Sequence, residues 1–343
     1  MGVVKKKDTL PFPMDMVGTY SCHGVEPGMR QGETSAKINQ DRGCVVYPFG
    51  MAGKDYEQAL FCVYDGHGAL GDKVSHYVMN NVQEKLEAHA QLDSNPGDAL
   101  KETFVTVDKA LQADKSIDAE LSGTTAVVVL VRQTKDGKMT CWSACAGDSR
   151  AVLCKKEKGV QKHASLKDAT CVDLTEDQKP DTPAEMARIK GKGGFVSPPE
   201  EEWGGPARVW LDANMTLPGL AMARSLGDHL VSSVGVIAEP VVEKFELGEI
   251  PKDSAAGDGQ YFICMASDGV WEFIESEQAC GLVLKFLDPE KNSGNEDSTL
   301  AVTKLIETAA AKWRQEEGDY RDDITAIVIR LRGLFESANK NAA

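Results

Sequence analysis

The chain has 343 residues, of which 42% are hydrophobic and 27% are charged, so its composition predicts a globular protein with a substantial core. The formal net charge of -15 argues against general binding to nucleic acid or to an anionic membrane. No run approaches the roughly 20 apolar residues of a membrane span, so we expect no stable membrane insertion. Nine scattered cysteines form no C-x-x-C pair, and the N-terminus carries no signal peptide. We therefore expect reduced thiols and a cytoplasmic or nuclear protein.

The two ends of the chain lack periodic patterns. We predict a flexible leader over residues 1–17, a single domain over residues 18–332 and a frayed tail over residues 333–343. Gly2 followed by lysines is compatible with N-myristoylation, but Lys6 stands where that motif has Ser or Thr. A disordered basic leader is the alternative interpretation.

The first half of the chain begins with strands and continues with helices. Short apolar runs at 19–25, 43–49 and 60–64 are separated by glycine and polar turns, which favours an antiparallel meander. Apolar residues at helical spacing then predict helices over 73–89 and 98–113.

A second block of strands and helices follows. Six prolines interrupt residues 155–219, where only 183–190 looks helical, and loops of this length are usually functional or disordered. The remaining predicted elements are strands at 126–131, 139–146, 150–154, 241–245, 261–266 and 324–331, a hairpin turn at 135–138, and helices at 276–287 and 298–313. Strands and helices in separate blocks predict an α+β fold, in which two sheets of mainly antiparallel strands are covered by helix pairs.

One motif points to a different function. Residues 66–71, Gly-His-Gly-Ala-Leu-Gly, match the dinucleotide-binding pattern G-x-G-x-x-G between a strand and a helix. The following helix runs into a second helix where that fold requires a parallel strand. Asp65 would also place a carboxylate against the phosphates that the helix N-terminus should bind. We therefore disfavour a nucleotide-binding oxidoreductase.

Aspartates stand at five separate strand ends. They are Asp41, Asp65, Asp148, Asp268 and the pair Asp322 and Asp323. A single aspartate in such a place is usually a turn former or a cap. Five that converge would repel one another unless divalent cations neutralise them. Oxygen ligands with few imidazoles indicate Mg²⁺ or Mn²⁺, and two such cations can activate water against a phosphate ester.

Seven short segments resemble, in order, the motifs of the type 2C metal-dependent Ser/Thr protein phosphatases, and the resemblance covers residues from about 19 to 332. They are Lys37-Ile38-Asn39-Gln40-Asp41, Asp65-Gly66-His67-Gly68, Ser122-Gly123-Thr124-Thr125-Ala126, Ala146-Gly147-Asp148-Ser149-Arg150, the run from Gly219 to Asp228, Ala266-Ser267-Asp268-Gly269-Val270-Trp271-Glu272 and Arg321-Asp322-Asp323-Ile324-Thr325. The resemblance implies a four-layer α-β-β-α sandwich with a binuclear metal centre between the sheets. It also implies hydrolysis of phosphoserine and phosphothreonine by direct attack of a metal-bridging water.

The resemblance also implies roles for single residues. Asp65 would bridge two Mg²⁺ or Mn²⁺ ions, and His67 would protonate the leaving oxygen as the general acid. The other implied metal-site residues are the carbonyl of Gly66, Asp268 and Asp322 for the first metal, Gln40 for the second, and Asp148 and Glu272 for a third, weaker site. Asp41 would hold metal-bound water, and Thr125 would lie near the active-site floor.

Three positions depart from the pattern. Gln40 falls where the family commonly has a glutamate, and Glu272 where an aspartate is frequent. Lys37 is the nearest basic residue for the substrate phosphate, and a solvated turn lysine is the equal alternative. Because Gln40 lacks a charge, the second hypothesis is a weakly active or inactive relative that binds phosphoproteins.

Residues 191–219 match the family's variable flap beside the active site. Trp203, Arg208 and Trp210 suit a loop that contacts a phosphopeptide, with Arg208 as a substrate-binding residue. A loop packed on its own tryptophans is the equal alternative. We expect phosphoprotein substrates, no nucleic acid partner and a monomer. A phosphatase of small molecules is a further alternative, because the metals and His67 do not determine which phosphorylated alcohol is the substrate.

Overall fold

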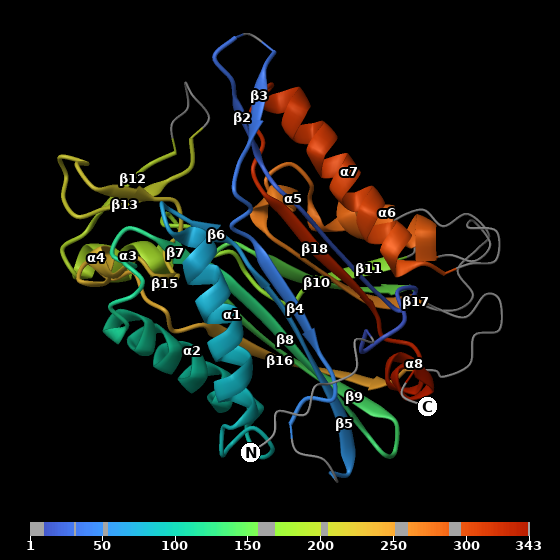
Figure 1. Ribbon diagram of the computed structural model, residues 1–343. Coiled ribbons are helices and arrows are strands. Elements are labelled where there is room, and N and C mark those ends of the chain that lie inside the picture. Colours follow the sequence, from blue (N-terminus) through green and yellow to red (C-terminus); the bar gives the residue numbers. More distant parts are fainter. Residues whose placement is uncertain are drawn as a thin grey trace.

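Two five-stranded antiparallel sheets form the centre of the computed structural model (Figure 1), which describes residues 10–30, 32–50, 54–156, 169–199, 205–250, 260–287 and 296–341. The first sheet has the order β1 (Val17–Cys22), β18 (Ile324–Arg330), β17 (Gln260–Ala266), β10 (Arg150–Lys156) and β11 (Ala169–Asp173). The second has the order β16 (Val241–Glu249), β9 (Lys138–Ala146), β8 (Ala126–Thr134), β5 (Tyr56–Tyr64) and β4 (Arg42–Val46).

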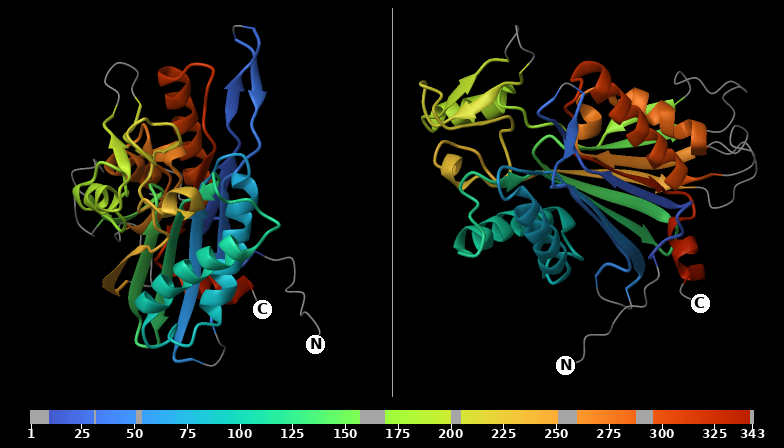
Figure 2. Two further views of the ribbon diagram at one scale, coloured as in Figure 1. Left: turned by 90° about the vertical axis from the view of Figure 1, so that its left-hand side faces the viewer. Right: turned by 45° about the horizontal axis from the view of Figure 1, so that its top comes forward.

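Helix pairs cover the outer faces of both sheets. Helices α1 (Gly71–Glu87) and α2 (Pro96–Ala113) lie on the second sheet, and α6 (Ser276–Leu287) and α7 (Ser298–Glu316) lie on the first. Figure 2 shows the sheets between the two helix pairs. This is the predicted α+β sandwich of four layers, and α6 has the predicted bounds. None of the described helices is long and apolar enough to span a bilayer.

Side chains alternate between the two faces of each strand, so they fill three apolar layers. One layer lies between the two sheets, and one lies under each helix pair. On β5, Phe61 and Val63 point between the sheets, whereas Leu60, Cys62 and Tyr64 point toward the helices α1 and α2. Both faces of the C-terminal part of this strand are buried, which is why residues 59–64 form a continuous apolar run.

The predicted meander at the N-terminus is correct for the runs at 43–49 and 60–64, which pair as β4 and β5, and wrong for the run at 19–25. Strand β1 pairs with β18 of the first sheet, with Tyr20 opposite Ala326, whereas β4 pairs with β5 of the second. The run at 19–25 therefore lies in a different sheet from the runs at 43–49 and 60–64. Between them a hairpin of β2 (Val25–Pro27) and β3 (Thr34–Ala36) projects from the sandwich (Figure 1). Turn residues show where strands end, but they do not choose the partner strand.

The predicted irregular region contains further strands. It holds the edge strand β11 and a small antiparallel sheet of β12 (Phe195–Ser197), β13 (Arg208–Trp210) and β14 (Pro218–Leu220). The predicted helix is present as α3 (Pro183–Gly191). Segments of three residues are too short for a periodic pattern to mark them.

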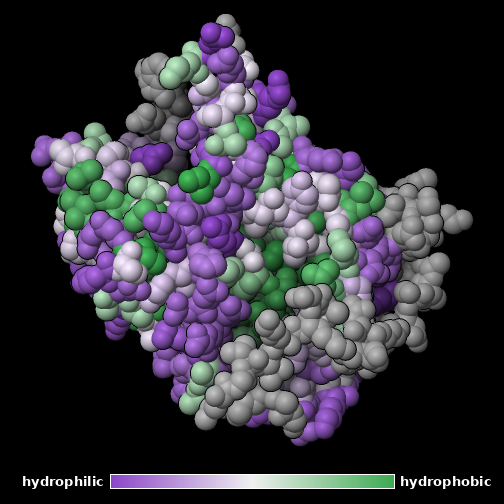
Figure 3. Space-filling view, viewed as in Figure 1, coloured by the Kyte–Doolittle hydropathy of each residue, from purple (hydrophilic) through white to green (hydrophobic). Residues whose placement is uncertain are grey.

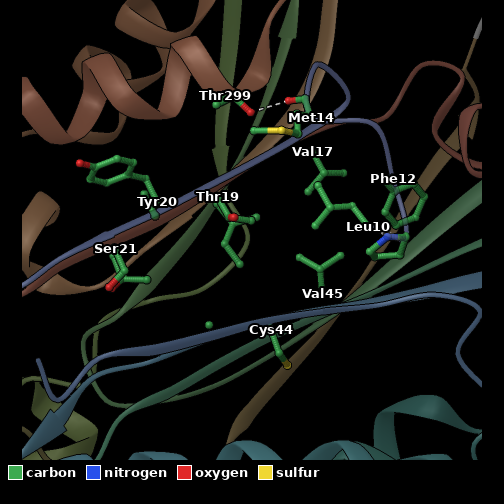
Figure 4. Close-up of a pocket in the computed structure, with 15 residues that line it drawn as sticks. Leu10, Phe12, Met14, Val17, Thr19, Tyr20, Ser21, Cys44, Val45 and Thr299 are labelled. Carbon is green, nitrogen blue, oxygen red and sulfur yellow. Dashed lines mark hydrogen bonds between the residues drawn. The ribbon is translucent and has the colours of Figure 1, made fainter. Parts of the chain in front are cut away.

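A cavity of about 460 Å³ opens beside β1 and β4, at the edge between the two sheets. Figure 4 shows Val17, Val45 and Phe12 around it, with the Thr299 hydroxyl donating to the carbonyl of Met14 at 2.7 Å. In the space-filling view apolar side chains gather near the centre of this face (Figure 3). Among the described residues, the lining of this cavity is mostly apolar and includes no carboxylate, imidazole or ammonium group.

Described residues near both ends of the chain pack against the sandwich, within the ranges where we expect a leader and a tail. Phe12 and Met16 are buried between the sheets, and the predicted frayed tail instead forms helix α8 (Leu334–Asn341). Phe335 of this helix is fully buried, with its ring 5.7 Å from that of Tyr47. The tail was missed because one turn of apolar residues resembles a short loop in sequence.

This packing predicts a stability effect at the C-terminus. Replacing Phe335 by alanine should lower the free energy of unfolding by about 3–5 kcal/mol, because it empties a buried aromatic site. Urea unfolding followed by circular dichroism measures it, with the exposed Met29→Ala as control. Equal unfolding midpoints for the wild type and the Phe335 variant would show that α8 does not stabilise the fold.

Candidate active site

Antiparallel register brings the predicted acids to one end of the sandwich. In the second sheet, Arg42 at the start of β4 lies opposite Tyr64 at the end of β5. Asp41 and Asp65 are the next residues beyond this pair, so they share one edge. The sequence pattern of strand followed by aspartate thus becomes a spatial cluster.

The first sheet contributes its acids at the same end. Ala266, the last residue of β17, is paired with Ala326 of β18 on one side and with the first residue of β10 on the other. Asp148, Asp268 and Asp322 all lie a few residues beyond these pairs. Two sheets therefore present their acids toward one another.

Burial and mutual repulsion raise the pKa values of these carboxyl groups. Burial is the largest cause for Asp41, whose pKa rises to about 7 with Asp323 and Asp322 nearby, even though hydroxyl hydrogen bonds oppose the shift. Burial, then Asp148 and Asp322, raises the pKa of Asp268 to about 8. The pKa of Asp65 lies well above its usual value because of burial and the charges of Asp41 and Asp268.

Several buried oxygens of the cluster have no protein partner. Among the described residues, the Oδ1 atoms of Asp41, Asp148 and Asp268 have no hydrogen-bond partner. Buried acceptors without donors are costly, and hard divalent cations satisfy them. The donor set of carboxylate oxygens thus fits Mg²⁺ or Mn²⁺.

The acids are neighbours without forming a tight cluster. Asp65 and Asp268 lie within hydrogen-bonding reach of each other. Within the described ranges, however, no three His, Cys, Asp or Glu ligand atoms at this end lie within 4.8 Å of one another.

Local backbone contacts fix Asp65 and Gly66. The Thr125 hydroxyl accepts from the backbone N–H of Asp65 at 3.0 Å, and the Thr125 N–H donates to the carbonyl of Asp65 at 2.8 Å. Any side chain at position 66 would collide with the carbonyls of Gly71 and Gln40. Thr125 is fully buried below Asp65, which fits the expected floor residue.

Gln40 faces the loop after Gly66. Its Nε2 donates to the carbonyl of Gly68 at 2.8 Å, and its backbone N–H donates to Asp323 Oδ2 at 2.8 Å. Asp323 is buried and also accepts from the N–H of Gly24 at 2.5 Å, so it holds two loops in place. Gln40 thus lies next to the acids with its amide group already bonded.

His67 is paired with an acid to which the sequence assigned no role. Strands β6 (Gly66–His67), β7 (Gly123–Thr124) and β15 (Leu226–Gly227) form a small sheet that brings Asp228 to the imidazole. Asp228 Oδ2 lies 2.7 Å from His67 Nε2 and accepts from the Ser225 hydroxyl at 2.6 Å. Burial lowers the pKa of His67, but the Asp228 charge outweighs it and raises the pKa above its usual value.

Glycine is required between these two side chains. A Cβ at Gly123 would collide with the Asp228 carboxylate and lie 2.8 Å from His67 Nε2. The sequence signal for Asp228 was its place at the end of the motif from Gly219, but nothing local shows that it meets His67.

Two lysines partly neutralise the acids. Lys37 Nζ donates to Asp322 Oδ1 at 2.8 Å, so Lys37 is not a solvated turn residue. Lys179 Nζ donates to Asp148 Oδ2 at 2.5 Å. Burial lowers both ammonium pKa values, but the neighbouring carboxylates outweigh it and raise them. Lys179 was missed, because it lies in the irregular region and is placed by Gln178, whose side chain accepts from Gly147 N–H at 2.7 Å.

In the described part of the chain, two expected site residues make no hydrogen bond or ion pair with the clustered acids. Glu272 is exposed at the C-terminal end of α5 (Asp268–Trp271). The Arg208 guanidinium donates to the carbonyl of Gly219 at 2.6 Å, inside the small sheet of β12 to β14. Trp210 donates to Ser197 at 3.0 Å in the same sheet, which favours self-packing there, and Trp203 lies outside the described residues.

Comparisons with known proteins agree with this geometry. The family model described as Protein phosphatase 2C matches residues 25–318. Probable protein phosphatase 2C 35 of Arabidopsis thaliana is 32% identical over 97% of this chain and 91% of its own length. Probable protein phosphatase 2C 61 of the same plant is 33% identical over 91% and 87%.

The fold is similar to that of solved structures. The crystal structure of serine-threonine phosphatase 2C from Toxoplasma gondii superposes with a TM-score of 0.67 at 19% identity, covering 92% of this chain and 94% of that chain. At this identity the likeness concerns the fold alone.

The buried acids predict an unusual effect on stability. In protein freed of metal at neutral pH, Asp268→Asn should raise the free energy of unfolding by about 1–3 kcal/mol, because it removes a carboxyl group that burial and repulsion destabilise. Thermal unfolding with and without Mn²⁺ measures it, and Mn²⁺ should stabilise the wild type more than the variant. The exposed Asp181→Asn is the control. A destabilised Asp268 variant in metal-free protein would contradict this account.

Proposed function

Because this chain belongs to the protein phosphatase 2C family and is a protein serine/threonine phosphatase, we propose that its acidic end hydrolyses phosphoserine and phosphothreonine with Mg²⁺ or Mn²⁺. The observation that carries the proposal is the set of buried carboxylate oxygens without protein partners. Their residue types fit hard divalent cations, and their position beside His67 fits a reaction that needs a proton donor.

We assign the cations to the acids and the loop around Asp65. Asp65, the carbonyl of Gly66, Asp268 and Asp322 would hold one cation, and Asp65 with Gln40 would hold a second. When bound, the cations would polarise the phosphoryl group and lower the pKa of water. Asp148 lies beside these residues and could add a third site, but the exposed Glu272 offers it little support.

The chain's own contribution to leaving-group departure comes from His67. Its Nε2 faces Asp228, while its Nδ1 has no partner among the described residues. In the imidazolium form, Nδ1 therefore carries a proton that it can give to the oxygen of serine or threonine. Asp228 stabilises the charged ring and fixes its orientation, so Asp228 acts through His67.

The remaining polar groups position the site. Asp41 accepts from the Ser267 hydroxyl at 2.8 Å and keeps its second oxygen free for a water molecule. Lys37 and Lys179 reduce the net negative charge that a phosphate dianion must approach. Lys37 is thus an electrostatic aid to substrate binding, with Asp322 as its anchor.

A weakly active phosphoprotein-binding protein is the second candidate, and one observation favours it. The Gln40 amide is neutral, and its nitrogen is bonded to the Gly68 carbonyl. A glutamate there would lose this hydrogen bond and be repelled by the carbonyl, so it would turn toward a cation.

Gln40→Glu separates the two candidates. Wild-type protein should hydrolyse a phosphothreonine peptide with Mn²⁺, and the variant should bind Mn²⁺ about tenfold more tightly, since it adds a charge to the ligand set. Calorimetric titration and phosphate release measure both effects. Gln112→Glu, which adds the same charge on the exposed face of α2, should change neither. Folded wild-type protein without activity at any Mn²⁺ concentration, but with restored activity in the variant, would favour the phosphoprotein-binding candidate.

Asp228→Asn tests the proton donor. We expect kcat for a phosphothreonine peptide to fall roughly 10–100-fold, because the imidazolium loses its stabilising charge. Activity on p-nitrophenyl phosphate should fall much less, since that leaving group departs without protonation. Asp108→Asn, which removes the carboxylate charge 3.0 Å from the imidazole of His229, is the matched control. Equal losses on both substrates would show that Asp228 supports structure and does not act through His67.

A further inference from the structure

Three cysteines converge on the outer face of the first sheet, away from the carboxylates. Cys154 of β10 lies directly opposite Cys171 of β11, and Cys280 lies on α6. Their Sγ atoms all lie within 4.8 Å of one another. All three thiols are free, so no disulfide accounts for the cluster.

The secondary structure explains why the three side chains meet. Residues directly opposite on antiparallel strands share a face, so Cys154 and Cys171 both point toward the helix layer. Cys280 lies on the buried face of α6, together with Ala279 and Val283. Three separate elements therefore supply one thiol each.

The surroundings are apolar. Cys154 and Cys280 are fully buried in the cluster of residues beneath α6 and α7, and Cys171 is partly exposed at its edge. A single buried cysteine usually packs as a small apolar side chain. The same layer contains mostly aliphatic and aromatic side chains, with Cys264 as a further buried thiol, and packing alone does not explain why these three thiols lie next to one another.

The spacing fits thiolate ligation. With a metal–sulfur distance of about 2.3 Å, three sulfurs around one tetrahedral cation lie about 3.8 Å apart, within the observed limit. Soft sulfur ligands select Zn²⁺ or Cu⁺ and disfavour Mg²⁺ and Mn²⁺. The exposed side of Cys171 leaves a path for the ion and a position for a water as fourth ligand.

We propose that Cys154, Cys171 and Cys280 form a second metal site, for Zn²⁺, that is chemically distinct from the carboxylate site. Binding releases three thiol protons to solvent and leaves one net negative charge with Zn²⁺, whereas Cu⁺ would leave two. Because the layer is apolar, the smaller residual charge favours Zn²⁺.

The site would tie the edge strand β11 to β10 and α6. The same three elements are linked by polar contacts at their other end, where Ser276 accepts from Arg150 at 3.1 Å and donates to Asp173 at 2.7 Å. Strand β10 starts two residues after Asp148. A cation at the thiols would therefore stabilise one wall of the acidic end.

Cd²⁺ is the probe that tests the proposal on the reduced, metal-free full chain. Thiolate ligation produces a sulfur-to-cadmium charge-transfer band in the ultraviolet, which carboxylate ligation does not. We expect the band to saturate at one Cd²⁺ per chain and to weaken in a large excess of Zn²⁺, because the two ions compete for the same thiolates although the softer Cd²⁺ binds them more tightly. Cys154→Ser, Cys171→Ser and Cys280→Ser should each weaken binding at least tenfold.

The control is Cys44→Ser, because Cys44 lies opposite Cys62 in a two-thiol pair on the other sheet. It should leave the band unchanged. Cys154 and Cys280 are fully buried and their serine variants could unfold, so the partly exposed Cys171→Ser, checked by circular dichroism, decides the outcome.

Three results would overturn the proposal. The first is a folded wild type without the band, and the second is a band that persists in Cys171→Ser. The third is a band whose intensity does not change even in a large excess of Zn²⁺. Loss of two free thiols on exposure to air, without any Cd²⁺ band in the reduced protein, would show instead a pair that forms a disulfide.

Discussion

Electrostatic repulsion among buried carboxylates at one end of the sandwich is the constraint on which the rest of the structure depends. Asp41, Asp65 and Asp268 all have pKa values raised by burial and by the charges of neighbouring carboxylates, so the folded chain stores unfavourable energy there. The apolar layers between the sheets and under both helix pairs must supply enough stability to hold these acids in place. Lys37 and Lys179 reduce the repulsion without abolishing it, and the remaining negative charge is what makes the site attractive to divalent cations.

The sandwich also separates the tasks of the site. Strand ends from both sheets carry the acids, while a small sheet of two-residue strands carries His67, the proposed proton donor, and leads to Asp228. His67 follows Asp65 by two residues, so one segment connects an acid of the cluster with the imidazole. Asp228 reaches His67 only through the pairing of β15 with β7, which requires glycine at position 123. The distance between the acids and His67 is therefore set by backbone pairing and not by flexible side chains.

The sequence predicted most long elements and most acids, because both leave local signals. Continuous apolar runs marked β5, β8 and β18, helical spacing marked α6 and α7, and aspartates beside glycine marked the strand ends. The features that the sequence did not predict depend on contacts between residues that are far apart in the chain. The partner of β1, the helix α8 on the sheet edge, the Asp228–His67 pair and the Lys179–Asp148 pair all join residues far apart in sequence. The three thiols of Cys154, Cys171 and Cys280 belong to the same class, since no spacing along the chain indicated them.

The central claim is that the acids of the two sheets together form a site for hard divalent cations. Anomalous diffraction from crystals soaked in Mn²⁺ tests it most directly, because it locates manganese independently of activity. The account predicts strong manganese peaks among Asp65, Asp268 and Asp322, with a further peak next to Gln40. A map without manganese at these carboxylates, from crystals in which the acids are ordered, would contradict it.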